Sequence, residues 1–198
     1  MPGSLFPMGP GVGARVMPRK LSTLLVTFVV VLALDQATKA LVAARIEPGG
    51  VGSAVPVIEG FFYITHARNP GAAFGLLVDW PWAWRLTVFV SVAILAVVVI
   101  ASFYRGLAPG ERFNAMALGL ILGGSIGNLV DRLTRGEVID FLHFRLWGSF
   151  AWPDFNVADS CIVLGVTALI IELLAVEGAS RAAHDRQRES TSGDDRSV

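Results

Sequence analysis

The chain has 198 residues, of which 54% are hydrophobic and only 16% are charged. Soluble domains carry about 25% charged residues, so this deficit indicates a protein of the lipid bilayer. The 16 Lys and Arg residues balance the 16 Asp and Glu residues, and this neutrality argues against a nucleic acid partner. A single cysteine, Cys161, excludes an internal disulfide framework.

Four apolar stretches predict four transmembrane helices, because each is close to the roughly 20 residues that a helix needs to cross the hydrocarbon core. They cover residues 21–44, 84–103, 113–130 and 157–176. The first stretch follows basic residues, so a signal peptide is an alternative interpretation. However, the apolar stretch continues past Asp35, which exceeds the length of a signal-peptide core.

The composition at the two ends of the chain differs from that of its middle. Residues 1–20 are rich in Gly and Pro, and residues 178–198 are polar and charged. We expect a disordered cytosolic leader over 1–20, one transmembrane domain over 21–177 and a disordered cytosolic tail over 178–198. The segments on the side of the termini contain nine Lys and Arg residues against four in the opposite loops. This bias predicts that both termini are cytoplasmic.

The loops on the opposite side have a different chemistry. Residues 51–66 are β-branched and aromatic and include Pro and Gly, a composition typical of short strands. The predicted fold class is therefore an all-α membrane protein with four transmembrane helices and a small extracytoplasmic region that contains β-structure. All five tryptophans lie in or beside these loops. They indicate either an ordinary interfacial belt or a lipid-facing platform beside a site.

Polar side chains in or next to the predicted helices gather at one membrane face. They are Asp35 and Lys39 in the first helix; Asn128, Asp131 and Arg132 in the third; Asp140 in the following loop; and Asn156 and Asp159 at the start of the fourth. Ionisable groups inside membranes are costly, so each is a candidate functional residue. Their common depth predicts a site at the extracytoplasmic boundary of the bilayer.

Three chemistries are open to such a site. A zinc site lacks the HExxH pair, and only three histidines are present. Gly123, Ser125 and Gly127 spell G-x-S-x-G, but this motif requires a strand–turn–helix elbow, and here it lies within a predicted helix. Asp140 and Asp159 flank a short loop and are a candidate pair for general acid–base catalysis. Spacing alone leaves structural and ion-binding roles open for this pair.

Five sequence blocks resemble the lipoprotein signal peptidase (signal peptidase II) family, in order and over roughly residues 22–176. They are residues 35–39 (DQATK), 69–74 (NPGAAF), 123–132 (GGSIGNLVDR), 138–141 (VIDF) and 155–160 (FNVADS). The family often has Ala where Ser125 stands, which weakens a serine mechanism further. We predict that Ser125 serves helix packing.

The resemblance implies roles for the residues in these blocks. The catalytic pair falls on Asp140 and Asp159. The remaining positions match residues that line the family's substrate pocket (Asn69, Asn128, Arg132 and Asn156) or support the site (Asp35, Lys39 and Asp131). For Asp35 and Lys39 we expect an ion pair within the membrane that orients the first helix. Asp131 is expected to be a salt-bridge partner or to support the helix end, rather than to take part in the chemistry.

The resemblance also implies the activity and its setting. The expected enzyme is an aspartic endopeptidase that removes signal peptides from diacylglyceryl-modified prolipoproteins, cutting before the lipidated cysteine. No metal or cofactor is expected. The expected partners are these prolipoproteins and membrane lipid, and the chain is expected to act as a monomer in the bacterial plasma membrane. The alternative is a small ion- or proton-coupled transporter, because intramembrane carboxylates with Lys and Arg also mark ion paths.

Overall fold

The structure is a computed structural model that describes residues 19–72, 76–147 and 150–194. The predicted leader up to residue 18, residues 73–74 of the NPGAAF block and residues 195–198 of the tail lie outside the described residues.

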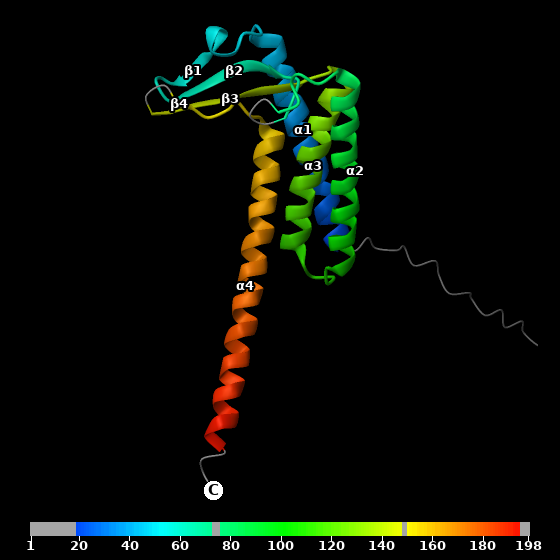
Figure 1. The fold of residues 1–198 in the computed structure, drawn as a ribbon, viewed down its shortest axis with the longest axis vertical. Coiled ribbons are helices and arrows are strands. Elements are labelled where there is room, and N and C mark those ends of the chain that lie inside the picture. The colour runs from blue at the N-terminus through cyan, green and yellow to red at the C-terminus, as the bar shows by residue number, and fades with distance from the viewer. Residues whose placement is uncertain (1–18, 73–75, 148–149, 195–198) are drawn as a thin grey trace, which may run out of the picture.

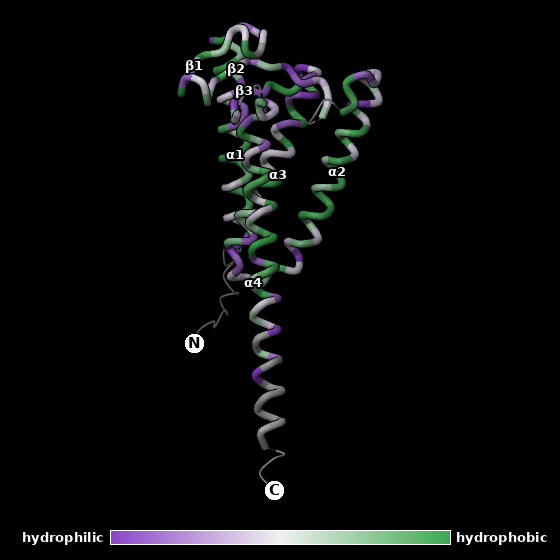
Figure 2. Tube along the Cα trace, turned by 60° about the vertical axis from the view of Figure 1, so that its left-hand side comes forward, coloured by the Kyte–Doolittle hydropathy of each residue, from purple (hydrophilic) through white to green (hydrophobic). Residues whose placement is uncertain are grey.

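Within the described ranges, four helices are long and apolar enough to cross a membrane, as the four apolar stretches predict. They are α1 (Arg19–Arg45), α2 (Trp82–Gly106), α3 (Arg112–Thr134) and α4 (Val157–Asp194). Most of their apolar side chains face outward, as is expected of helices surrounded by lipid. Figure 2 shows apolar residues along the helices and hydrophilic residues gathered where the helices meet the sheet. We call this end of the bundle the sheet end.

A small antiparallel sheet covers the sheet end of the bundle (Figure 1). Its order is β1 (Val55–Ile58), β2 (Phe62–Asn69), β3 (Val138–Trp147) and β4 (Phe150–Ala151), and a 3-10 turn, η1 (Gly50–Ser53), precedes β1. Strands β1 and β2 lie where residues 51–66 predict strands. Strand β3 corrects the expectation that Asp140 lies in a loop. The first four residues of β3 are all buried, so the alternation that marks a half-buried strand is missing.

Helix α3 contacts the other three membrane-spanning helices, and glycines allow the close approach. A Cβ atom on Gly123 would lie 2.7 Å from Cβ of Val31 in α1. A Cβ atom on Gly124 would collide with the backbone carbonyl oxygen of Ala158 in α4. Small residues at helix contacts are the usual means of packing helices in membranes. These contacts fix the heights at which polar residues of α1, α3 and α4 meet.

The C-terminal segment differs from its prediction. Residues 178–198 were expected to be disordered, whereas α4 continues as a helix as far as Asp194 (Figure 1). The segment that spans the membrane by length and composition is Val157–Arg181. Arg181 pairs with Glu177 one turn earlier, and such i,i+4 pairs support an exposed helix.

The packing of α3 leads to a prediction about two adjacent positions. Gly124→Ala should destabilise the protein by about 1–3 kcal/mol, because a methyl group has no room against the α4 backbone. Ser125→Ala is the matched control, since it lies next along the helix and only removes a hydroxyl group. Thermal unfolding in detergent measures both. Equal unfolding temperatures for the two variants would contradict this account of the α3–α4 contact.

Candidate active site

A cavity of about 960 Å³ lies between the sheet, α3 and the start of α4. Five of the residues predicted for the site line it: Asn69, Asn128, Arg132, Asp140 and Asp159. Asn156, the remaining residue predicted to line the pocket, is fully buried and bonded to several of these residues. The structure therefore brings side chains from four separate segments of the chain into one place.

Asp140 reaches the cavity because β2 and β3 pair in a register that places Ala67 opposite it. Asn69, two residues further along β2, donates from Nδ2 to Asp140 Oδ2 at 3.0 Å. The Nδ2 atom of Asn156 donates to the other oxygen, Oδ1, at 2.7 Å. Both carboxyl oxygens of Asp140 thus accept a hydrogen bond from an asparagine amide. The carboxyl group is held in a fixed direction at the cavity wall.

Asp159 is fixed by the first turn of α4. Its backbone N–H donates to Asn156 Oδ1 at 3.0 Å, and the backbone N–H of Asn156 donates to Asp159 Oδ2 at 3.2 Å. This reciprocal pair is the geometry of a capping box, which satisfies two backbone donors at a helix N-terminus. The second carboxylate oxygen accepts from Asn128 Nδ2 at 2.7 Å. Residues of the FNVADS block therefore both begin α4 and position the carboxylate of Asp159.

A buried charged cluster is connected to the cavity through Asn128, which lines the cavity and contacts Lys39. Lys39 is fully buried, and its ammonium group lies 2.9 Å from both Asp35 Oδ2 and Asp131 Oδ2. The same Nζ atom donates to Asn128 Oδ1 at 2.8 Å. The predicted ion pair of Asp35 and Lys39 is present, and Asp131 is a salt-bridge partner of Lys39. We refer to Asp35, Lys39 and Asp131 as the buried triad.

Arg132 is held in place by contacts within the protein. Its guanidinium group donates to the carbonyl oxygens of Gly71 at 2.9 Å and Asn128 at 3.1 Å, and it lies 3.8 Å from the ring centroid of Phe89. The contact with Gly71 connects α3 to the segment that follows β2. The Nε atom is buried and has no partner within the described part of the chain.

Sequence reasoning did not single out several residues that complete this region. Gln36 donates to Asp35, Asp131 and the carbonyl oxygen of Gly127, and Arg135 pairs with Asp131. The position of Arg135, four residues after Asp131, is a helix-spacing signal that predicts such a pair.

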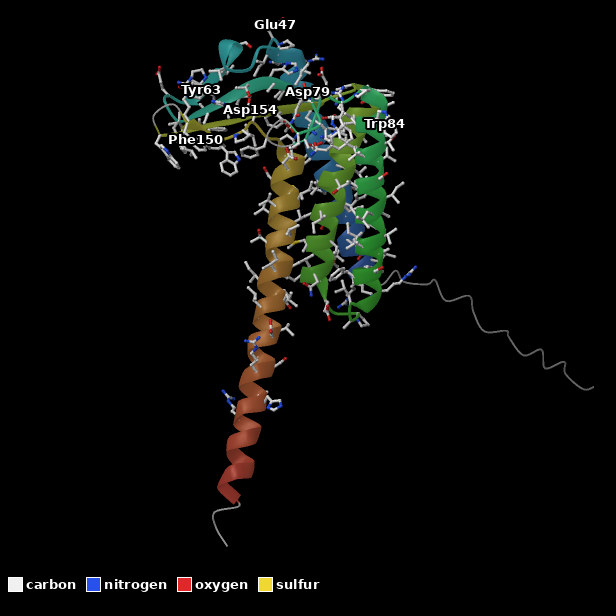
Figure 3. The ribbon with its side chains drawn as sticks, viewed as in Figure 1. Glu47, Tyr63, Asp79, Trp84, Phe150 and Asp154 are labelled. Atoms are coloured by element: carbon white, nitrogen blue, oxygen red, sulfur yellow. The ribbon has the colours of Figure 1, made fainter. Side chains whose placement is uncertain are left out.

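A second group is formed by residues far apart in the chain. Asp154, which is labelled in Figure 3, borders the cavity. Its carboxylate accepts a hydrogen bond from Thr65 Oγ1 at 2.7 Å and lies 2.5 Å from His143 Nδ1. No spacing rule connects these three residues, so only the folded sheet reveals the group.

The environment of Asp140 favours a protonated carboxyl group. Asp140 lies in β3, outside the membrane-spanning helices, and its pKa is raised from 3.8 to about 7. Burial is the largest cause, and the negative charge of Asp159 is the second. The hydrogen bonds from Asn69 and Asn156 stabilise the ionised form and limit the rise. Below about pH 7 the cavity therefore presents a carboxylic acid beside a second carboxyl group.

Much of the remaining cavity lining is apolar. Trp152, Pro153 and Phe155 border it on the sheet side, and Ile162, Val163 and Leu164 border it on α4. Among residues 19–72, 76–147 and 150–194, no three His, Cys, Asp or Glu side chains gather as metal ligands do. The arrangement suits proton transfer by carboxyl groups next to an apolar ligand.

The raised pKa of Asp140 predicts a pH dependence of stability. The folded protein binds this proton more tightly than the unfolded chain does, so its stabilising contribution is present at low pH and is lost as the pH rises from about 4 to about 7. In Asp140→Asn this contribution to the change of stability with pH should disappear. Unfolding temperatures of both proteins in detergent across this range test the sign. If the unfolding temperature of the wild type rose relative to that of Asp140→Asn as the pH increased, the predicted sign would be contradicted.

Comparisons with known proteins identify the family. The family described as signal peptidase (SPase) II matches residues 27–175. The chain is 44% identical to the lipoprotein signal peptidase of Geobacter sulfurreducens over 74% of this chain and 88% of that protein. It is 43% identical to that of Moorella thermoacetica, over 75% and 90%.

Solved structures agree with this result. A bacterial membrane enzyme solved by the in meso method has a TM-score of 0.67 and 33% identity, covering 78% of this chain and 89% of that one. The fold, the cavity and these likenesses lead to one conclusion: the chain belongs to the lipoprotein signal peptidase (signal peptidase II) family.

Proposed function

We propose that this chain is an aspartic endopeptidase that cuts diacylglyceryl-modified prolipoproteins immediately before the lipidated cysteine. The observation that carries the proposal is the pair of Asp140 and Asp159 on one cavity at the end of a membrane-spanning bundle. Each carboxyl group accepts hydrogen bonds from a different asparagine side chain and is bonded to Asn156. Two carboxyl groups in one cavity are poised to share a proton.

The proposed reaction is direct attack by water without a covalent intermediate. Asp159, as the carboxylate, takes a proton from water while the water oxygen attacks the scissile carbonyl carbon. Asp140, as the acid, donates a hydrogen bond to the carbonyl oxygen and stabilises the tetrahedral intermediate. A proton then passes to the departing amine nitrogen as the carbon–nitrogen bond breaks. The raised pKa of Asp140 supports its assignment as the acid.

The walls of the cavity suit a substrate that is part peptide and part lipid. Arg132 lines the cavity and is proposed to contact the backbone of the bound signal peptide. Ile162, Val163 and Leu164 of α4 form an apolar wall, and Val163 and Leu164 are exposed. An acyl chain or a signal helix in the bilayer therefore has a continuous apolar path along α4 to the carboxyl pair.

The setting follows from this chemistry. We place both termini in the cytoplasm and the sheet on the extracytoplasmic side of the bacterial plasma membrane, as the excess of basic residues near the termini favours. Exported prolipoproteins present their scissile bond at that surface. The chain is proposed to act as a monomer, because one copy supplies both carboxyl groups and the donors to them.

The transporter alternative is not favoured. A transport path requires polar groups across the full thickness of the membrane. Among the residues that the structure describes, the buried charged ones are Asp35, Lys39, Asp131 and Asp140, and they lie near the sheet end.

Conservative variants of the carboxyl pair test the proposed function. Asp140→Asn and Asp159→Asn preserve size but cannot transfer the proton, so each should lower cleavage by roughly 10²- to 10⁴-fold. The double variant should be little worse than either single variant, because residues acting as a unit are not additive. The assay is cleavage of a lipidated prolipoprotein by purified protein in detergent.

Two controls accompany this assay. Thermal unfolding shows whether each variant is folded, and Ser125→Ala reports on a change in α3 away from the carboxyl pair. Substantial cleavage by a folded Asp140→Asn or Asp159→Asn variant would refute the assignment of the pair.

The apolar cavity wall also predicts that cleavage depends on lipid. A prolipoprotein whose cysteine lacks diacylglycerol should be a poor substrate, because it forgoes the burial of acyl chains against α4. Competition between the modified and unmodified forms of one prolipoprotein measures the ratio of kcat/KM directly. Equal values would show that the site does not recognise the lipid.

A further inference from the structure

The buried triad has contacts that ion pairing alone does not explain. Asp35 Oδ1 accepts a hydrogen bond from the backbone N–H of Ala158 at 3.0 Å, and Ala158 directly precedes Asp159. Asp131 Oδ2 accepts from the backbone N–H of Ile139 at 3.4 Å, and Ile139 directly precedes Asp140. Each acid of the triad thus holds the backbone next to one member of the carboxyl pair.

Lys39 connects these two contacts and adds a third. Its ammonium group has three N–H donors, and the three acceptors around it are Asp35, Asp131 and Asn128. The side chain is fully buried, so water does not compete for these donors. An ammonium group donates and never accepts, and the amide of Asn128 must therefore turn its oxygen toward Lys39.

The orientation of the Asn128 amide determines which of its atoms faces the carboxylate of Asp159. With Oδ1 directed at Lys39, Nδ2 points away and donates to Asp159 Oδ1 at 2.7 Å. A reversed amide would place an oxygen against a carboxylate oxygen. The amide direction therefore determines whether Asp159 meets a hydrogen-bond donor or a second acceptor.

The same oxygen of Asn128 also orients the second asparagine. Asn156 Nδ2 donates to Asn128 Oδ1 at 3.2 Å and to Asp140 Oδ1 at 2.7 Å. A chain of hydrogen bonds thus runs from one buried ammonium group through two amides to both carboxyl groups.

We propose that Lys39 is a positioning residue for the carboxyl pair, acting through the amide direction of Asn128. It does not touch the reacting atoms. It ensures that Asn128 donates to Asp159 and that Asn156 donates to Asp140. This inference rests on the proposed function of the pair and explains why a lysine is buried beneath it.

The test separates hydrogen bonding by Lys39 from its charge. In an Asp35→Asn background, which keeps an acceptor for Ala158 and lowers the buried negative charge, Lys39→Gln and Lys39→Met are compared. Both replacements are neutral and similar in length, but only glutamine has N–H donors that can meet Asn128 Oδ1. Cleavage of a lipidated prolipoprotein is measured against pH, and unfolding temperatures confirm folding.

The glutamine variant should retain kcat within a few-fold of the Asp35→Asn parent, with the same acid limb of its pH profile. The methionine variant should lose about tenfold or more in kcat, the effect of one hydrogen bond. The acid limb of its pH profile should differ from that of the parent, because one member of the carboxyl pair has lost a hydrogen-bond donor. KM should change little in either variant, since the substrate contacts remain.

Identical pH profiles and rates for the two variants would overturn the proposal and leave charge as the role of Lys39. If the methionine variant does not fold, the pH profile of the glutamine variant is compared with that of the Asp35→Asn parent. An unchanged acid limb supports positioning, and a shift of about one pH unit opposes it. Failure of the proposed function is distinguishable, because the Asp35→Asn parent and the wild type would then show no cleavage at any pH.

Discussion

The ammonium group of Lys39 is the constraint on which the site depends. A buried charge costs several kcal/mol unless it is paired and hydrogen bonded, and breaking such a pair costs about 3–5 kcal/mol. Here two carboxylates and one amide oxygen meet the charge, and they come from α1 and α3. The helices must therefore pack at one relative height. Gly127 permits this approach, since a Cβ atom there would lie 2.5 Å from Asp35 Oδ2.

The sheet end positions the two carboxyl groups of the proposed catalytic pair relative to these helices. Strand β3 begins shortly after α3 ends, and its pairing with β2 turns Asp140 toward the cavity beside Asn69. Helix α4 begins with a capping box that directs Asp159 toward the same cavity. The residues Trp84 of α2 and Phe150 of β4 lie at a similar level in Figure 3, so the sheet and the helix ends share one boundary. The carboxyl pair lies at this boundary, between the sheet and the start of α4.

The sequence predicts the four helices and the buried ion pair of α1 for a physical reason. Apolar stretches of bilayer length leave few alternatives, and a polar residue inside one of them requires a partner. Asp35 and Lys39 are one turn apart, so their ion pair follows from helix geometry. Strand β3 escaped prediction because burial on both sides removes its alternating pattern. The group of Thr65, His143 and Asp154 also escaped, because its members meet only through the folded sheet.

The central claim is that the carboxyl pair cuts a lipidated prolipoprotein next to its modified cysteine. Mass spectrometry of the products formed by the purified chain in detergent tests it most directly. The account predicts two products, an intact signal peptide and a lipoprotein that begins with the diacylglyceryl cysteine. A substrate that stays intact, or one that is cut at another bond, would contradict the account.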